Sequence, residues 1–214
     1  MNDILFGISA KDWAEIIRNY VIAASAIFTA WIAWHGLKNW KEQQVWKFNH
    51  DLAKELLTSS ICVKTKALNL IMTSAIRSTS LETLHKGLRL TSESKDIELI
   101  SISDDLFSQL QEVKKERLKF DAKGQEAIHV WGGDITQSFF DTNALLSELM
   151  YAANCRCYIA RYPNSTSVKW NEMIKASQGR ALQFNPSGDE FSTLLQHRFT
   201  EFNDHLKQYL EQRK

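Results

Sequence analysis

The residues Asn19-Tyr-Val-Ile-Ala-Ala-Ser-Ala-Ile-Phe-Thr-Ala-Trp-Ile-Ala-Trp-His-Gly-Leu37 contain no charged side chain and lie between Arg18 and Lys38. A hydrocarbon core of about 30 Å requires roughly 20 helical residues, so this run is long enough for one crossing. The alternative is a helix buried in a soluble core, but such a helix usually carries charge on one face. The run therefore predicts a single transmembrane helix over residues 19–37.

The residues that flank this run indicate its orientation. Tryptophans near both ends resemble the aromatic belts of membrane interfaces: Trp13 on one side, Trp31, Trp34 and Trp40 on the other. Lys38, Lys41, Lys47 and Lys54 follow the run, whereas only Lys11 and Arg18 precede it. The positive-inside rule then places residues 1–18 outside the cytoplasm as a short tail, and residues 38–214 in the cytoplasm. Because no basic stretch precedes the run and no cleavage site follows it, we expect an anchor rather than a signal peptide.

Composition predicts an all-α fold for the rest of the chain. Only two prolines and eight glycines occur among 214 residues, and apolar residues recur at steps of three and four. Residues 38–214 are numerous enough for one domain with a core, and we expect a helical bundle of about four long helices. Three cysteines without a framework spacing suit a reducing compartment.

The periodicity divides this domain into helices. The first helix runs from a capping sequence at Ser9 through the anchor to Ile76. Its predicted buried stripe consists of Phe48, Leu52, Leu56, Val63, Ala67 and Leu70. Five more apolar residues broaden this stripe: Ala53, Leu57, Ile61, Ile71 and Ala75. Residues 78–96 are expected to be a loop with a short helix near 81–88, because they are rich in Ser and Thr. A short amphipathic piece over 168–176 and a turn over 183–189 are expected nearer the carboxyl end.

Three further helices are predicted. Ser103-Asp-Asp begins one that buries Leu106, Leu110, Val113 and Leu118, with a solvated face of Lys114, Lys115, Glu116, Arg117 and Lys119. The next buries Ile135, Phe139, Thr142, Leu146, Leu149, Ala153 and Cys157 at nearly heptad spacing, and ends at Arg161. The last, about 189–211, buries Phe191, Leu195, Phe199, Phe202, Leu206 and Leu210.

The segment Trp131-Gly132-Gly133-Asp134 is the candidate partner-binding site. The two glycines suit a tight crossing between helices, and Asp134 suits a cap for the helix at Ile135. A purely structural role is one interpretation. The other is a recognition surface formed by Trp131, Gly132 and Asp134, since a Trp edge beside exposed backbone is common in interfaces.

The sequence contains none of the common catalytic motifs: no phosphate loop, no His-Glu-x-x-His, no Gly-x-Ser-x-Gly and no Cys-x-x-Cys. A metal or redox pair is the minor alternative for Cys155-Arg-Cys157. A metal or acid–base role is the minor alternative for His197 with Glu201 and for Asp204 with His205. A formal net charge of +1 and lysines without aromatic platforms argue against nucleic acid. We therefore expect a non-enzymatic protein without cofactor, metal or nucleic-acid partner.

Small residues in the anchor suggest self-association. Ala23, Ala26, Ala30 and Ala33 recur at steps of three and four, which places them on one seam of a left-handed supercoil. Small residues let helices approach closely in lipid, so a homo-oligomer is expected. The alternative is that alanine is simply common in weakly hydrophobic anchors.

The order of several short motifs resembles a family of bacterial single-pass membrane proteins of uncharacterised activity. These motifs are Trp40-Lys-Glu-Gln43, Asp51-Leu-Ala-Lys-Glu-Leu-Leu57, Trp131-Gly-Gly-Asp-Ile135 and Asp189-Glu-Phe191, after a single span. The resemblance implies an inner-membrane protein with a cytoplasmic helical domain and a link to mobile or phage-defence functions. It brings no catalytic residues.

Two functions follow as expectations. The first is a membrane-anchored interaction or signal-sensing module that binds a protein partner beside the inner membrane. The alternative is an effector that permeabilises the membrane in an abortive-infection or toxin system, because Ser25, Thr29 and several alanines make the span less apolar than a Leu-rich anchor. An enzyme without a recognisable motif is a third class.

Overall fold

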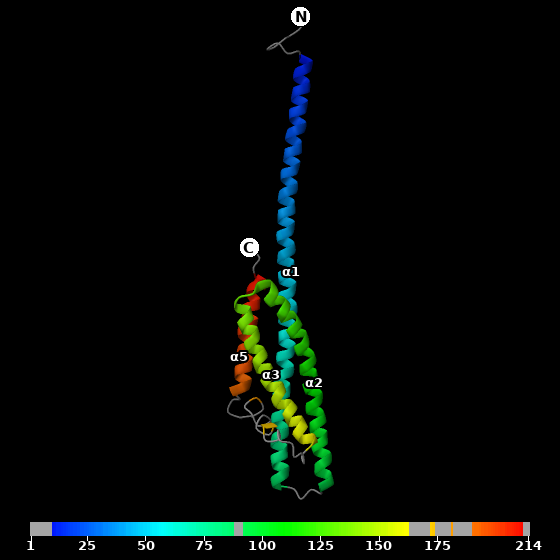
Figure 1. Cartoon of the computed structure of the whole chain (residues 1–214), viewed down its shortest axis with the longest axis vertical. Coiled ribbons are helices and arrows are strands. Elements are labelled where there is room, and N and C mark those ends of the chain that lie inside the picture. The colour runs from blue at the N-terminus through cyan, green and yellow to red at the C-terminus, as the bar shows by residue number, and fades with distance from the viewer. Residues whose placement is uncertain (1–9, 88–91, 163–171, 174–180, 182–189, 212–214) are drawn as a thin grey trace. The chain divides into compact units, whose positions relative to one another are not determined.

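The structure, a computed structural model, describes residues 10–87, 92–162, 172–173, 181 and 190–211. Its long elements are α1 (Ala10–Gly87), α2 (Ser92–Trp131), α3 (Asp134–Arg161) and α5 (Glu190–Glu211) (Figure 1). Regular structure in these described residues is entirely helical, so the predicted all-α class and the four long helices are confirmed. The contacts divide the chain into two units, Met1–Asn49 and His50–Lys214, and each is described by itself.

The first unit contains the beginning of α1. Gly36 does not interrupt the helix, as expected for a single glycine whose cost is about 1 kcal/mol. All side chains from Lys11 to Val45 are exposed. Phe48, which was expected in the buried stripe, is also 48% exposed, so that prediction is wrong. Buried positions on α1 begin at Leu52, one turn later.

The second unit has one continuous apolar core built from all four helices. Its centre is a cluster of phenylalanines from three of them. The ring centroid of Phe120 lies 5.2 Å from Phe139, 5.3 Å from Phe202 and 6.1 Å from Phe199. Aromatic pairs at these separations add about 0.5–1.5 kcal/mol each to the burial of their area. The cluster therefore ties α2, α3 and α5 together.

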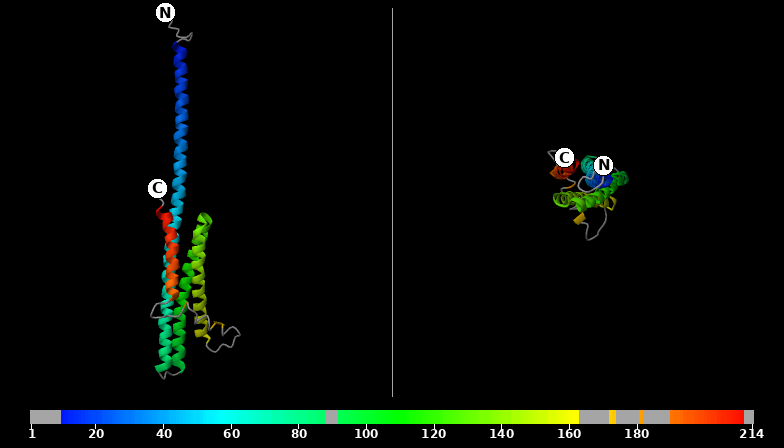
Figure 2. Two further views of the ribbon diagram at one scale, coloured as in Figure 1. Left: turned by 90° about the vertical axis from the view of Figure 1, so that its left-hand side faces the viewer. Right: turned by 90° about the horizontal axis from the view of Figure 1, so that it is seen from above.

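Ion pairs show that α2 runs antiparallel to residues 50–87 of α1, as Figures 1 and 2 also show. Glu55 pairs with Lys123 at 2.7 Å, and Lys66 pairs with Glu112. The later residue on α1 thus meets the earlier residue on α2. Arg161 of α3 pairs with Asp104 of α2 at 2.9 Å, so α3 turns back along α2 in the same manner.

The link between the first two helices of this unit is much shorter than predicted. Instead of ending near Arg77, α1 continues to Gly87, and α2 begins at Ser92 rather than at Ser103. Residues 81–87 of the expected separate helix are part of α1, and Leu88 lies outside the described residues. Ser and Thr cost only a few tenths of a kcal/mol each in a helix, and no proline occurs in this stretch, so its polar composition did not stop the helices.

The predicted core faces of α3 and α5 are confirmed. All seven predicted positions on α3 are buried, and five of the six on α5 are buried, with Leu210 partly exposed. The prediction at Leu118 of α2 is wrong, since this side chain is 71% exposed. Continuing from Val113 by steps of four and three leads to Phe120, which is fully buried instead. Ile61 on α1, also predicted to be buried, is 50% exposed.

Arg117 departs from the solvated face predicted for α2. Its Nη2 donates to Ser147 Oγ of α3 at 2.8 Å, and its Nε lies 3.4 Å from Asp121 Oδ2. It therefore joins α2 to α3. The capping residue Ser9, most of the short helix predicted over 168–176 and the turn over 183–189 lie outside the described residues.

Candidate functional sites

The apolar run in the first unit is the clearest surface feature of the chain. Each side chain from Asn19 to Leu37 is exposed, including the four alanines of the predicted seam, Ala23, Ala26, Ala30 and Ala33. By length and composition, this is the one described helix that is long and apolar enough to cross a membrane. No part of its most apolar window is buried, which argues against the alternative of a core helix.

Three polar side chains of this run lie within hydrogen-bond distance of carbonyl groups of their own helix. Ser25 Oγ donates to the carbonyl of Ile22 and Thr29 Oγ1 to that of Ser25, both at 2.8 Å. Nδ1 of His35 lies 3.1 Å from the carbonyl oxygen of Trp31. A polar group that is already hydrogen-bonded is far cheaper to place in a medium without water. These residues therefore require neither a partner helix nor a water-filled pore.

Aromatic and basic side chains meet where the apolar run ends. Trp34, Leu37, Lys38 and Lys41 line a shallow hollow of about 210 Å³ together with Glu42. Trp and Lys combine an apolar body with a polar tip, which is the pattern of side chains at a membrane–water interface.

The segment around Trp131 forms the corner between α2 and α3. Gly132 and Gly133 have φ of 58° and 59°, which residues with a Cβ rarely adopt, so the predicted glycine crossing is confirmed. Gly133, at ψ −136°, occupies the cap position of α3. The expected cap by Asp134 is wrong, because Asp134 is the first residue of the helix. The side chain of Asp134 lies outside the part of the chain that the structure describes.

The ring of Trp131 packs within the fold. It stacks on Tyr209 of α5 with centroids 4.0 Å apart and an angle of 11° between the rings, and it packs against the core. One face of the indole is thus covered by α5. The neighbouring Val130 and His129 are exposed. The geometry gives Trp131 a structural role, and recognition of a partner by Trp131, Gly132 and Asp134 stays a prediction.

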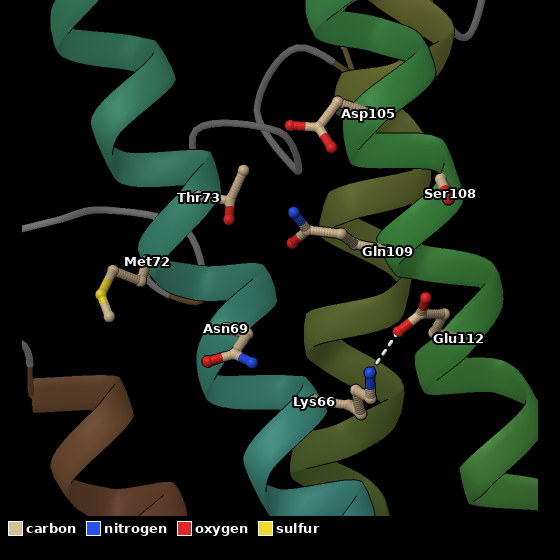
Figure 3. A pocket seen from close by; sticks show the side chains of 8 residues that line it. All are labelled: Lys66, Asn69, Met72, Thr73, Asp105, Ser108, Gln109 and Glu112. Atoms are coloured by element: carbon tan, nitrogen blue, oxygen red, sulfur yellow. Dashed lines mark hydrogen bonds and ion pairs between the residues drawn. The ribbon is translucent and has the colours of Figure 1, made fainter.

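A polar groove between α1 and α2 was not found from the sequence. Figure 3 shows this groove, which has a volume of about 460 Å³. Its α1 wall consists of Lys66, Asn69, Met72 and Thr73. Its α2 wall consists of Asp105, Ser108, Gln109 and Glu112.

The groove carries both fixed charge and an unused acceptor. The ion pair between Lys66 and Glu112 closes one end, and the hydrogen bond from Lys66 to Glu112 raises the pKa of the Lys66 ammonium. The carboxamide of Gln109 reaches from α2 toward α1 (Figure 3). Its oxygen is buried and accepts no hydrogen bond from the residues that the structure describes.

A sequence signal for this groove exists, although it is weak. Lys66, Asn69 and Thr73 recur at three and four along α1, and Asp105, Gln109 and Glu112 recur at four and three along α2. Each is a polar stripe beside an apolar one. Such stripes normally face solvent, so only the pairing of the two helices shows that they face each other.

The cysteine and histidine candidates do not assemble into a centre. Cys155 and Cys157 are buried as free thiols, and burial raises the pKa of the Cys157 thiol to about 11. Arg156 between them turns to α1, where Nη1 donates to the carbonyl of Ser74 at 3.1 Å. His197 and Glu201 approach to 3.4 Å on an exposed face. In the described part of the chain, no three His, Cys, Asp or Glu residues could hold a metal ion together.

Comparison of the chain with protein-family models, with curated proteins and with solved structures finds no match.

Proposed function

We propose that residues 19–37 cross the bacterial inner membrane and that residues 38–214 form a cytoplasmic helical bundle, which acts as an interaction or signal-sensing module. The observation that carries the proposal is the complete exposure of an uncharged apolar run. Contiguous apolar surface of this size on a protein usually contacts a membrane or another protein. A run long enough for the hydrocarbon core favours the membrane.

The energetics support an anchor. Moving a fully exposed Ile or Phe side chain out of water yields about 1.5–3 kcal/mol. Ile22, Ile27, Phe28 and Ile32 of the run are between 51% and 72% exposed, so each gains a large part of this amount. The hydrogen bonds of Ser25 and Thr29 to their own backbone lower the opposing cost of burying polar groups.

The orientation rests on the excess of lysines after the run and agrees with the three free thiols. The proposal of binding rather than turnover rests on features that suit contact with a partner, namely the glycine corner at Trp131 and the groove between α1 and α2. The proposed link to phage defence rests only on the order of short motifs along the chain.

Membrane extraction tests the anchor. We expect the full chain to remain with membranes after washing with alkaline carbonate. Replacing both Phe28 and Ile32 by Lys places two charges in the middle of the run. Each Lys raises the free energy of membrane insertion by about 2.5–3.5 kcal/mol, so this variant should be released from the membrane. The matched control is Leu118→Lys, which changes an exposed apolar residue of α2 and should leave the chain in the membrane. Release of the parent chain by carbonate would contradict the proposal.

The second candidate function is a membrane-permeabilising effector, and the small and polar residues of the run favour it. Since Ser25 and Thr29 are already hydrogen-bonded within the helix, they do not by themselves call for a pore. A potential-sensitive dye separates the two functions in cells that overproduce the chain during phage challenge. The effector requires depolarisation, whereas the interaction module predicts a preserved potential.

A further inference from the structure

We propose that the outer face of α3 pairs with the same face of a second copy of this chain, with the two helices parallel and in register. The outer face consists of the exposed residues of α3 between positions 137 and 158, which are Gln137, Phe140, Ala144, Ser147, Tyr151, Asn154 and Tyr158. It lies wholly within the second unit. The pairing therefore goes beyond the proposed function and does not depend on whether residues 19–37 cross a membrane.

The outer face of α3 carries no charge, which is unusual for the solvent side of a helix. The structure describes every residue from Gln137 to Tyr158, and the seven residues of the outer face are the exposed ones among them. On α2, by contrast, Lys115 and Lys119 are exposed beside Leu118. Identical faces without charge meet without electrostatic repulsion, so the outer face suits contact with its own copy.

Three aromatic rings project from the outer face. Phe140, Tyr151 and Tyr158 are between 40% and 58% exposed. A fully buried aromatic side chain removes about 150–250 Å² from water, so the three rings offer roughly 200–400 Å² per copy. A standard interface buries about 800 Å² per partner. The area of the rings therefore suits a reversible pairing rather than a permanent one.

Two of these rings are held in place before a partner binds. The ring centroid of Phe140 lies 5.8 Å from that of Phe139, and the ring centroid of Tyr158 lies 4.9 Å from that of Tyr162. A side chain that is already packed loses little freedom when a partner covers it, which lowers the free-energy cost of association.

The spacing of the outer face selects a helix as its occupant. The seven residues recur at steps of three, four, three, four, three and four. This is the spacing of the a and d positions of a heptad, along which two helices pack side by side. The distance from Gln137 to Tyr158 is about 31 Å along the helix axis. A second copy of α3 has the length and the spacing that such an occupant requires.

The polar residues Gln137 and Ser147 of the outer face are already hydrogen-bonded within the chain. Gln137 Nε2 donates to Asp141 Oδ1 at 2.7 Å, and Ser147 Oγ donates to the carbonyl of Asn143 at 2.8 Å. Burial of a polar group costs much less when it keeps a hydrogen bond. A second helix can therefore cover both side chains at low cost.

Asn154 determines the direction of the second helix. No hydrogen bond joins its carboxamide to the part of the chain that the structure describes. In a parallel pair Asn154 faces its own counterpart, and two carboxamides can donate to and accept from each other. In an antiparallel pair it would face Ala144, which would leave its polar atoms buried without a partner. An Asn among the positions that pack together also fixes the register of coiled coils.

A membrane surface fits the outer face less well than a second copy does. Helices that lie on membranes are rich in Lys and Arg beside their apolar face. Arg156 is the one basic residue of α3 in the range 135–159. Its Nη1 donates to the carbonyl of Ser74 on α1, so it points into the fold.

Crosslinking of the full chain in membranes of the producing cells tests the pairing. The exposed native Cys62 is first replaced by Ser, whereas Cys155 and Cys157 are buried and remain. Ala144→Cys and Asn154→Cys are then introduced singly and treated with a short bis-maleimide, and gel electrophoresis measures the covalent dimer. We expect each variant to form a dimer with itself, because parallel helices in register bring equal positions together.

Control variants locate the contact. Lys115→Cys places a thiol on the exposed side of α2 and should give at least tenfold less dimer than Ala144→Cys. Adding Tyr151→Lys to Ala144→Cys puts an unpaired charge into the interface and should lower the dimer yield at least tenfold. Adding Tyr151→Phe keeps the ring, and adding Leu118→Lys puts the same charge on α2, so both should leave the yield unchanged. Circular dichroism verifies that each variant keeps its helix content.

Four results would overturn the proposal. The first is the absence of dimer from Ala144→Cys, and the second is an equal yield from Lys115→Cys, which would indicate only general proximity. The third is that Ala144→Cys and Asn154→Cys crosslink only when mixed. These positions lie equally far from the middle of the outer face, so this pattern would show an antiparallel pair. The fourth is a crosslink from Ala144→Cys to a different protein alone.

Discussion

The ring of Phe139 on α3 lies directly against the backbone of Gly124 on α2. A Cβ atom added at Gly124 would lie only 1.9 Å from Cε2 of that ring, and both residues are buried. Glycine is thus required here for space rather than for backbone conformation. The contact lets the central Phe cluster form where α2 and α3 approach each other.

The first prediction is that Gly124→Ala destabilises the second unit. Overpacking of a core typically costs about 1–3 kcal/mol, although Ala is intrinsically the better helix former by about 1 kcal/mol. The free energy of unfolding of the full chain in detergent, followed by circular dichroism in denaturant, measures the effect. Phe139→Leu removes ring atoms from the contact, so the double variant should lose less than the sum of the two single losses. Strictly additive losses would show that the contact is not the cause.

The second prediction concerns the core faces. Leu146 and Phe199 are fully buried, so truncation of either to Ala should lower the free energy of unfolding by about 2–5 kcal/mol. Lys115→Ala on the exposed face of α2 should change it by less than about 0.5 kcal/mol. Similar small effects at all three positions would mean that the faces are assigned wrongly.

The third prediction concerns the corner at Gly133. Its φ of 59° with ψ of −136° lies in a region that is strongly unfavourable for any residue with a Cβ. Gly133→Ala should therefore cost about 1–3 kcal/mol of stability. Gly133→Asn should cost about as much, because Asn favours the left-handed helical region at positive ψ instead. A stable Asn variant would argue for a different conformation at this corner.

The fourth prediction is the topology. A reporter that is active only in the cytoplasm should function when fused after Lys214, and a reporter that is active only in the periplasm should not. The reverse pattern would overturn the orientation and the interpretation of the free cysteines.

The fifth prediction is self-association through the alanine seam. Replacing Ala26 and Ala30 by Leu should weaken oligomers in a membrane-association assay while insertion is preserved, because larger side chains keep helices apart. The control replaces Ala24 and Phe28 by Leu. These two positions do not lie on the seam, so this variant should associate as its parent does. If the seam variant associates as strongly as its parent, any oligomer must form through other surfaces.

The strongest periodic patterns predicted the structure well. The buried faces of α3 and α5 follow from their apolar residues, because nearly every turn of each helix repeats the same signal. Failures occurred where one local signal was given too much weight. Ser103-Asp-Asp resembles a helix start but lies inside α2, and Leu118 is apolar but faces away from the core.

The candidate sites were harder to predict from the sequence than the buried faces of the helices. The glycines at 132 and 133 indicated a sharp corner, but no pattern shows that Tyr209 stacks on Trp131. The groove depends on which polar stripe of α2 faces which polar stripe of α1. That is a property of tertiary pairing, whereas periodicity describes one helix at a time.

The two ion pairs between α1 and α2 favour one alignment of these helices along each other. Glu55 and Lys66 are separated by the same number of residues as Glu112 and Lys123, so both pairs specify one alignment. Sliding α2 by four residues in one direction would place Lys66 opposite Ser108 and Glu55 opposite Lys119. Sliding it in the other direction would place Glu55 opposite Ala127 and Lys66 opposite Glu116. Only the native alignment therefore forms two opposite-charge pairs, and each slip keeps one. Exposed pairs add at most about 1 kcal/mol each to stability. The loss of one pair disfavours a misaligned helix hairpin by the same amount, although that hairpin buries similar apolar stripes and competes with the native state during folding.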